Sequence, residues 1–134
     1  MQDGDHTQQT VVKKVLCIED EHFINELYAR ALTKAGYQVK VVIDGEEGLR
    51  EALTNIYDII LLDIMLPNLI GTEVLKQLRA KLPNLRAKVI ITTNLELGKE
   101  DRAAIEAQAD GYIVKADLTP RQMADFLKQL ELTP

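Results

Sequence analysis

The sequence has few of the residues that build disulfides, zinc sites or aromatic cores. Its 134 residues include no tryptophan, two phenylalanines, four tyrosines, two histidines and one cysteine. One cysteine cannot form an internal disulfide, and this set of histidine and cysteine does not make a zinc site. Because aromatic residues are so few, we expect an aliphatic core. Because Cys17 lies inside an apolar run and nothing indicates an oxidising compartment, we expect a cytoplasmic location.

Basic residues and long apolar runs are also scarce. Lys and Arg number 16 against 21 Asp and Glu, and this balance disfavours direct nucleic-acid binding, which calls for a basic stripe. The longest apolar runs, such as residues 59–62, are far too short to span a bilayer, and the polar N-terminus lacks the apolar segment of a signal peptide. We therefore expect no membrane association, and one domain over residues 12–134 after a flexible arm over residues 1–11.

A regular alternation of β-rich and helical segments fills the chain from Val11 onward. The β-rich segments are mostly apolar, as in parallel strands that are covered on both faces. Strict alternation predicts an α/β fold, a doubly wound parallel sheet of five strands in the order 2-1-3-4-5. The expected strands are residues 14–18, 38–43, 58–62, 88–92 and 111–114, and the expected helices are residues 22–35, 46–55, 72–81, 99–108 and 120–130.

Local signals support these boundaries. Gly36 follows the first helix, Asp44 precedes the second, and Thr119 with Pro120 provides an N-cap and a first helical residue for the last. The first helix also has helical apolar spacing. Its expected face consists of Phe23, Leu27, Ala31 and Ala35, with Ile24, Tyr28 and Leu32 beside it.

Reactive side chains stand where the expected strands end. In an open parallel sheet, ligands bind beyond the carboxyl ends of the strands, where the strand order reverses. Carboxylates, a hydroxyl and an ammonium group would converge there. In chain order, the residues at these ends are Glu19, Asp20, Glu21, Asp63, Thr93 and Lys115.

Clustered carboxylates need a cation, because two like charges about 4 Å apart repel by about 4 kcal/mol at an effective dielectric of about 20. Mg²⁺ prefers such hard oxygen ligands. Held by Asp20 and Asp63, it would leave a second oxygen of Asp63 as a nucleophile toward phosphorus. Lys115 and the Thr93 hydroxyl would then neutralise phosphoryl oxygens.

Taken singly, each of these residues also fits an ordinary structural role. Asp20 or Glu21 would cap the first helix, Thr93 would end a strand, and Lys115 would be solvated. Their joint placement at separate strand ends is the informative observation, and it predicts a Mg²⁺-dependent phosphoryl acceptor.

Four segments, VLCIEDE, IILLDIMLPNLIG, VIITTN and GYIVKA, resemble the signatures of bacterial two-component response-regulator receiver domains, the group that includes the chemotaxis receiver. The resemblance covers residues 13–132 and implies the flavodoxin-like (βα)5 receiver fold. The spacing of Thr93, Tyr112 and Lys115 from Asp63 also matches the spacing in receivers.

The resemblance implies that Asp63 is the phosphoacceptor. Asp20 would bind Mg²⁺ directly and Glu19 through water, and the backbone carbonyl of Met65 would complete the protein's share of the ligands. The donor would be a sensor histidine kinase or a phosphotransfer protein. Such a domain catalyses only its own phosphorylation and dephosphorylation and is no enzyme in the metabolic sense.

The same resemblance implies a switch. Thr93 would hydrogen-bond the phosphoryl group, Lys115 would pair first with Asp63 and then with the phosphate, and Tyr112 would turn inward as Thr93 moves. The surface made by the fourth helix, fifth strand and fifth helix would then engage a downstream protein, an effector domain outside this sequence, or a second copy in a homodimer.

Three positions depart from the receiver pattern. Ala116 stands where a cis proline usually follows the lysine, so we expect a trans peptide and a looser loop. Ile70 replaces a common Asp, which leaves Thr72 as the expected cap of the third helix. Asn94 replaces a smaller residue and would narrow access to the phosphoryl group.

Three other functions remain to be weighed. A pseudo-receiver or docking module that switches without phosphate is the main alternative, because of Ala116. A phosphohydrolase of the haloacid dehalogenase type would need an acid where Met65 stands. A flavin or dinucleotide site is disfavoured because the first loop reads EDEHF, without glycine for a phosphate.

Overall fold

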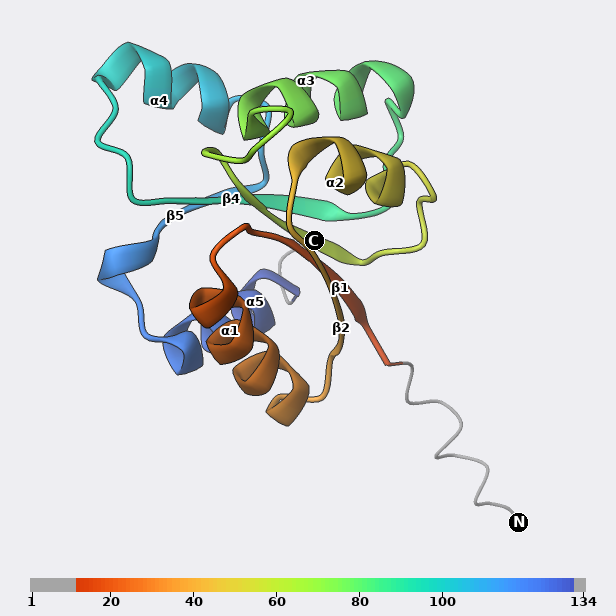
Figure 1. The fold of residues 1–134 in the computed structure, drawn as a ribbon, viewed down its shortest axis with the longest axis vertical. Coiled ribbons are helices and arrows are strands. Elements are labelled where there is room, and N and C mark those ends of the chain that lie inside the picture. The colour runs from red at the N-terminus through yellow and green to blue at the C-terminus, as the bar shows by residue number, and fades with distance from the viewer. Residues whose placement is uncertain (1–11, 132–134) are drawn as a thin grey trace.

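The computed structural model describes residues 12–131, so the expected arm over residues 1–11 lies outside the described residues. Strands and helices alternate along the chain, as predicted (Figure 1). Among the described residues no helix has the length and apolar character needed to cross a membrane. In chain order the elements are β1 (Lys14–Ile18), α1 (His22–Lys34), β2 (Gln38–Val42), α2 (Gly45–Ala52), β3 (Ile59–Asp63), α3 (Gly71–Lys81), β4 (Lys88–Thr93), α4 (Lys99–Glu106), β5 (Gly111–Val114), the 3-10 turn η2 (Lys115–Asp117) and α5 (Pro120–Glu131).

The strands form one parallel sheet in the order β2-β1-β3-β4-β5, which confirms the predicted topology. The three central strands are almost entirely buried, as their uniform apolar sequences predict. The edge strands β2 and β5 keep half-exposed positions because each has a neighbour on one side only. The reversal of strand order lies between β1 and β3, so the carboxyl ends of these two strands are the expected ligand site.

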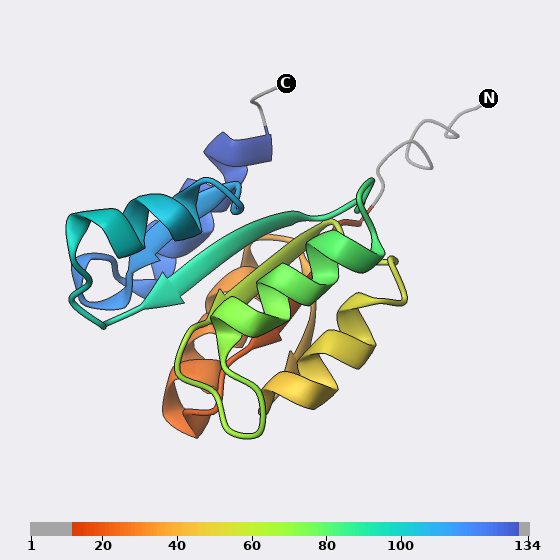
Figure 2. The ribbon, with the colours of Figure 1, turned by 90° about the horizontal axis from the view of Figure 1, so that it is seen from above.

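Helices cover both faces of the sheet. Figures 1 and 2 show α1 and α5 on one face and α2, α3 and α4 on the other. Because side chains alternate along a strand, β1 and β3 supply residues to both cores. One core joins Leu16, Ile18, Ile60 and Leu62 to Leu75 and Leu78, and the other joins Val15, Cys17, Ile59 and Leu61 to Tyr28, Leu32, Met123 and Leu127.

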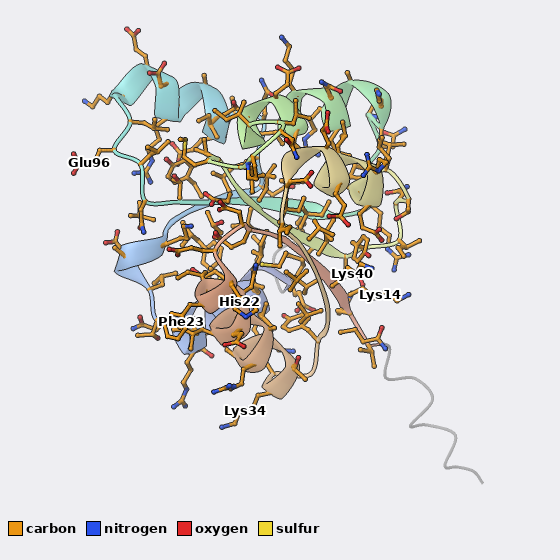
Figure 3. All side chains as sticks on the ribbon, in the orientation of Figure 1. Lys14, His22, Phe23, Lys34, Lys40 and Glu96 are labelled. Atoms are coloured by element: carbon orange, nitrogen blue, oxygen red, sulfur yellow. The ribbon has the colours of Figure 1, made fainter. Side chains whose placement is uncertain are left out.

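The predicted apolar face of α1 is wrong at its first residue. Phe23 is 68% exposed and lies beside His22 at the start of α1 (Figure 3). The buried stripe instead consists of Asn25, Tyr28 and Leu32, which follow one another at helical spacing. Phe23 lies in the first turn of α1, rotated away from this stripe.

The helix ends use the predicted signals. Gly36 has φ +101°, a left-handed conformation that ends α1. The Asp44 carboxylate accepts a hydrogen bond from the Glu47 N–H at 2.8 Å, so Asp44 caps α2. Thr119 Oγ1 accepts from the Gln122 N–H at 3.1 Å, while the Gln122 side chain accepts from the Thr119 N–H at 2.9 Å, which completes a capping box.

Candidate functional site

The fold brings the predicted side chains together at the carboxyl edge of the sheet. Asp63 ends β3, Thr93 ends β4, and Glu19 and Lys115 directly follow β1 and β5. One carboxylate oxygen each from Glu19, Asp20 and Asp63 lies within 4.8 Å of the other two. Glu19 and Asp63 are buried and Asp20 is exposed, so the cluster is open to solvent on the Asp20 side.

Lys115 is the cation that faces this cluster. Its ammonium group donates to Glu19 Oε1 at 2.7 Å and to Asp63 Oδ2 at 3.2 Å. The pairing with Asp63 was predicted, whereas the shorter bond to Glu19 was not. One ammonium group leaves the three carboxylates with excess negative charge, so this donor set fits a divalent cation.

Burial and the nearby charge of Glu19 raise the pKa of Asp63 to about 6. Burial alone would lower the pKa of Lys115, but its hydrogen bond to Glu19 and the charge of Asp63 raise it overall. Lys115 is therefore held in its charged form. The negative charges of Asp63 and Glu19 repel each other, and a bound cation or a proton would reduce this repulsion.

The β1–α1 loop is fixed by a residue that the sequence analysis missed. Asn25 is buried, and its side-chain amide donates to the Glu19 carbonyl at 2.6 Å. Glu19 Oε2 also accepts from the Glu21 N–H at 3.0 Å. The signal in the sequence was a polar residue in the same helical stripe as Tyr28 and Leu32. Asn25 thus orients the loop that carries the acidic pair.

A glycine shapes the loop after Asp63. A Cβ atom at Gly71 would lie 2.0 Å from the Asp63 carbonyl oxygen, so only glycine fits there. The Gly71 N–H donates to the Ile64 carbonyl at 2.7 Å, which closes the loop against the end of β3. Met65 lies in this loop with an exposed side chain, directly after Ile64.

The expected cap of α3 is wrong. The helix begins at Gly71, so Thr72 lies inside its first turn, and Ile70 occupies the N-cap without a side-chain hydrogen bond. The Ile70 side chain is exposed. The substitution at Ile70 therefore removes the side-chain cap without a replacement at Thr72.

The two predicted switch residues lie on adjacent strands. Thr93 is buried, and its Oγ1 accepts from the Leu95 N–H at 3.0 Å, which leaves its own O–H as a donor. Tyr112 on β5 packs against the core on the α3 side of the sheet. The Arg102 guanidinium of α4 lies 4.3 Å from the centre of the Tyr112 ring, a cation–π contact.

The loop after Lys115 is joined to the loop after Thr93 by a hydrogen bond. No peptide bond within residues 12–131 is cis, so the predicted trans peptide before Ala116 is confirmed. The Ala116 N–H donates to Asn94 Oδ1 at 2.8 Å, and residues 115–117 form a 3-10 turn. This hydrogen bond ties the loop to the end of β4, and the looser loop stays a prediction.

The comparisons with known proteins agree with this geometry. The family model described as response regulator receiver domain matches residues 15–128. Response regulator ArlR of Staphylococcus saprophyticus is 39% identical over 102 residues, which are 76% of this chain and 45% of that protein. The alkaline phosphatase synthesis transcriptional regulatory protein PhoP of Bacillus subtilis is 38% identical over 118 residues, 88% of this chain and 48% of that protein. The chain spans about half the length of the curated relatives it matches.

Solved structures show the same likeness over nearly their whole length. A CheY-like response regulator receiver domain protein from Methanospirillum hungatei superposes with a TM-score of 0.78 at 28% identity, over 90% of this chain and 95% of that one. Response regulator protein TrrA from Thermotoga maritima, in complex with Mg²⁺–BeF, gives 0.77 at 31% identity, over 89% and 99%. This chain belongs to the response regulator receiver domain family.

Proposed function

We propose that this chain accepts a phosphoryl group on Asp63, in the presence of Mg²⁺, from a sensor histidine kinase or a phosphotransfer protein. The observation that carries the proposal is the buried Asp63 carboxylate, which shares one cluster with Glu19 and Asp20 and lies 3.2 Å from Lys115. The proposed compartment is the cytoplasm. The chain acts only on itself, through its own phosphorylation and dephosphorylation.

The proposed metal ligands differ in how directly they bind. Both carboxylate oxygens of Glu19 accept hydrogen bonds, from Lys115 and from the Glu21 N–H, which supports the proposal that Glu19 would hold the ion through water. Asp20 and Asp63, whose carboxylate oxygens cluster with that of Glu19, would be direct ligands, together with the Met65 carbonyl. When bound, Mg²⁺ neutralises negative charge on the carboxylates and on the phosphoryl oxygens.

The other residues position the reaction. One oxygen of the Asp63 carboxylate forms the bond to phosphorus, and the bond from phosphorus to the donor breaks with its electron pair on the donor. Lys115 moves its hydrogen bond from Asp63 to a phosphoryl oxygen, and the free Thr93 O–H donates to another. The related TrrA in complex with Mg²⁺–BeF supports a Mg²⁺-dependent site in this family member.

The proposed switch uses Thr93 and Tyr112. As Thr93 moves toward the phosphoryl group, Tyr112 turns inward and leaves its contact with Arg102. This changes the surface formed by α4, β5 and α5, which we propose as the docking surface for a downstream protein, for an effector domain beyond this chain, or for a second copy. Relatives named as transcriptional regulatory proteins support an effector of that kind.

Incubation with acetyl phosphate and Mg²⁺, followed by intact mass spectrometry, tests the phosphoacceptor. The wild-type protein should gain one phosphoryl group, and Asp63→Asn should gain none. Asp58→Asn is the matched control, because Asp58 precedes the same strand at its opposite end, and this variant should be modified normally. Unmodified wild-type protein, or a modified Asp63→Asn, would contradict the proposal.

A titration with Mg²⁺ separates this proposal from the pseudo-receiver alternative. The wild-type protein should bind one Mg²⁺ in isothermal calorimetry, and Asp20→Asn should bind it at least tenfold more weakly, because it loses a charged ligand. A protein without measurable Mg²⁺ binding would favour a phosphate-independent docking module.

A further inference from the structure

One hydrogen bond joins the loops that follow β4 and β5. Asn94 directly follows Thr93, Ala116 directly follows Lys115, and the Ala116 N–H donates to Asn94 Oδ1 at 2.8 Å. The bond therefore connects the neighbours of two residues that face the site from different strands. Among the described residues, no other hydrogen bond joins these two loops.

The peptide group after Lys115 is held at both of its ends. Asn94 accepts from the N–H of Ala116, and the carbonyl of Lys115 accepts from the Leu118 N–H at 3.4 Å. The backbone from which the Lys115 side chain starts is therefore fixed in direction. The other end of that side chain contacts Glu19 and Asp63.

The Asn94 side chain is itself held by a turn. The Leu95 N–H donates back to Thr93 Oγ1 at 3.0 Å, which fixes the backbone on both sides of Asn94. Asn94 thus presents its acceptor oxygen from a constrained position. An alanine at position 116 offers the N–H that this oxygen needs, whereas a proline would not.

We propose that Asn94 is a positioning residue for phosphoryl acceptance, because it fixes the backbone of Lys115 through the N–H of Ala116. The inference rests on the proposed function of Asp63 and Lys115. It assigns Asn94 a role through hydrogen bonding, in contrast to the expectation that its bulk narrows access to the phosphoryl group.

Three variants separate the hydrogen bond from the bulk of the side chain. Asn94→Leu keeps the size and loses the acceptor, Asn94→Ala loses both, and Asn94→Asp keeps an acceptor oxygen. The leucine and alanine variants should accept phosphoryl groups from acetyl phosphate about threefold to tenfold more slowly, the range that corresponds to one exposed hydrogen bond. If alanine instead accelerates the reaction while leucine matches the wild type, bulk is the cause and the inference is wrong.

Two NMR signals report on the bond without any phosphorylation. Hydrogen exchange of the Ala116 amide should be slowed in the wild type and in Asn94→Asp, and fast in Asn94→Leu and Asn94→Ala. The ¹⁵Nζ ammonium signal of Lys115 should be observable in the wild type and broadened in the leucine variant, which a purely structural loss elsewhere would not produce. Urea unfolding of each variant checks that the fold is retained.

The outcomes distinguish the two proposals. A wild-type protein that takes up no phosphoryl group would overturn the proposed function, whereas the Ala116 and Lys115 signals would still test the link. Normal phosphorylation and an unchanged Lys115 signal in Asn94→Leu would overturn the role of Asn94 alone.

Discussion

Two aspartates stand at opposite ends of β3 and are treated differently by the fold. Asp58, directly before the strand, accepts from the Lys14 N–H and from the Arg86 guanidinium, both at 2.8 Å. Burial works to raise the pKa of Asp58, but these hydrogen bonds lower it overall. Asp63, at the other end, has Lys115 as its cationic partner among the described residues and lies near Glu19, and its pKa rises to about 6.

The different surroundings of the two aspartates show where a charged carboxylate lowers the stability of the fold. At the amino edge of the sheet a carboxylate is matched by donors, so its charge supports folding. At the carboxyl edge a carboxylate is buried beside another one, so its charge opposes folding until a cation or a proton arrives. One strand of a stable sheet is thus flanked by a structural carboxylate at one end and by the proposed phosphoacceptor at the other, and their different surroundings predict opposite effects on stability.

Removal of Lys115 should have the largest effect on stability. Lys115→Met leaves Glu19 and Asp63 buried without a cation, which we expect to lower the free energy of unfolding by about 3 kcal/mol in the absence of metal. Urea unfolding in EDTA measures this. The double variant Lys115→Met with Asp63→Asn should recover much of this loss. A loss below about 1 kcal/mol for the single variant would show that Glu19 and Asp63 do not need a cation between them.

Substitution of the two aspartates should change stability in opposite directions. At pH 7 without metal, Asp63→Asn should stabilise the protein by at most about 3 kcal/mol, because the pKa of Asp63 is raised from 3.8 to about 6 and each pKa unit corresponds to about 1.4 kcal/mol. Asp58→Asn should destabilise it by about 1 to 2 kcal/mol through weaker hydrogen bonds. Thermal or urea unfolding measures both changes. If both variants shift stability in the same direction, the two carboxylates do not differ in their effect on folding.

The pH dependence of these differences follows from the directions of the pKa shifts. The raised pKa of Asp63 means that its ionisation lowers stability as pH rises from about 4 through about 6. The gain from Asp63→Asn should therefore be near zero at pH 4 and full at pH 7. The lowered pKa of Asp58 means that its contribution is present at pH 7 and is lost as the pH falls below its ordinary value of 3.8.

The smallest effect is expected at Arg86. Its guanidinium is more than half exposed where it pairs with Asp58, so Arg86→Met should cost at most about 1 kcal/mol. The cost should shrink in high salt, since exposed charges are screened. A loss as large as that of Lys115→Met would mean that both edges depend equally on their cations. Unfolding at two salt concentrations makes the measurement.

The sequence was sufficient for the topology and for the clustering of Glu19, Asp20 and Asp63 with Lys115, because the carboxyl ends of strands in a parallel sheet converge at one edge. The contacts that decide how the site is held were not predictable in this way. The bond from Lys115 to Glu19 and the bond from Ala116 to Asn94 depend on loop backbone directions, which hydrophobic periodicity does not encode. Phe23 was expected on the buried face of α1 but is exposed, whereas Asn25, which was not predicted, is buried, because a small rotation around a helix separates an exposed residue from a buried one.

The close approach of Gly71 to the backbone of Asp63 limits which residue this position of the loop can hold. Any side chain at this position would overlap the carbonyl oxygen of Asp63, so a change there should displace the proposed phosphoacceptor without touching its carboxylate. The side chains of Met65 and Ile70 in the same loop are exposed. The loop therefore joins a position that only glycine fits to positions whose side chains reach solvent, so a partner can contact the loop without altering the backbone beneath Asp63.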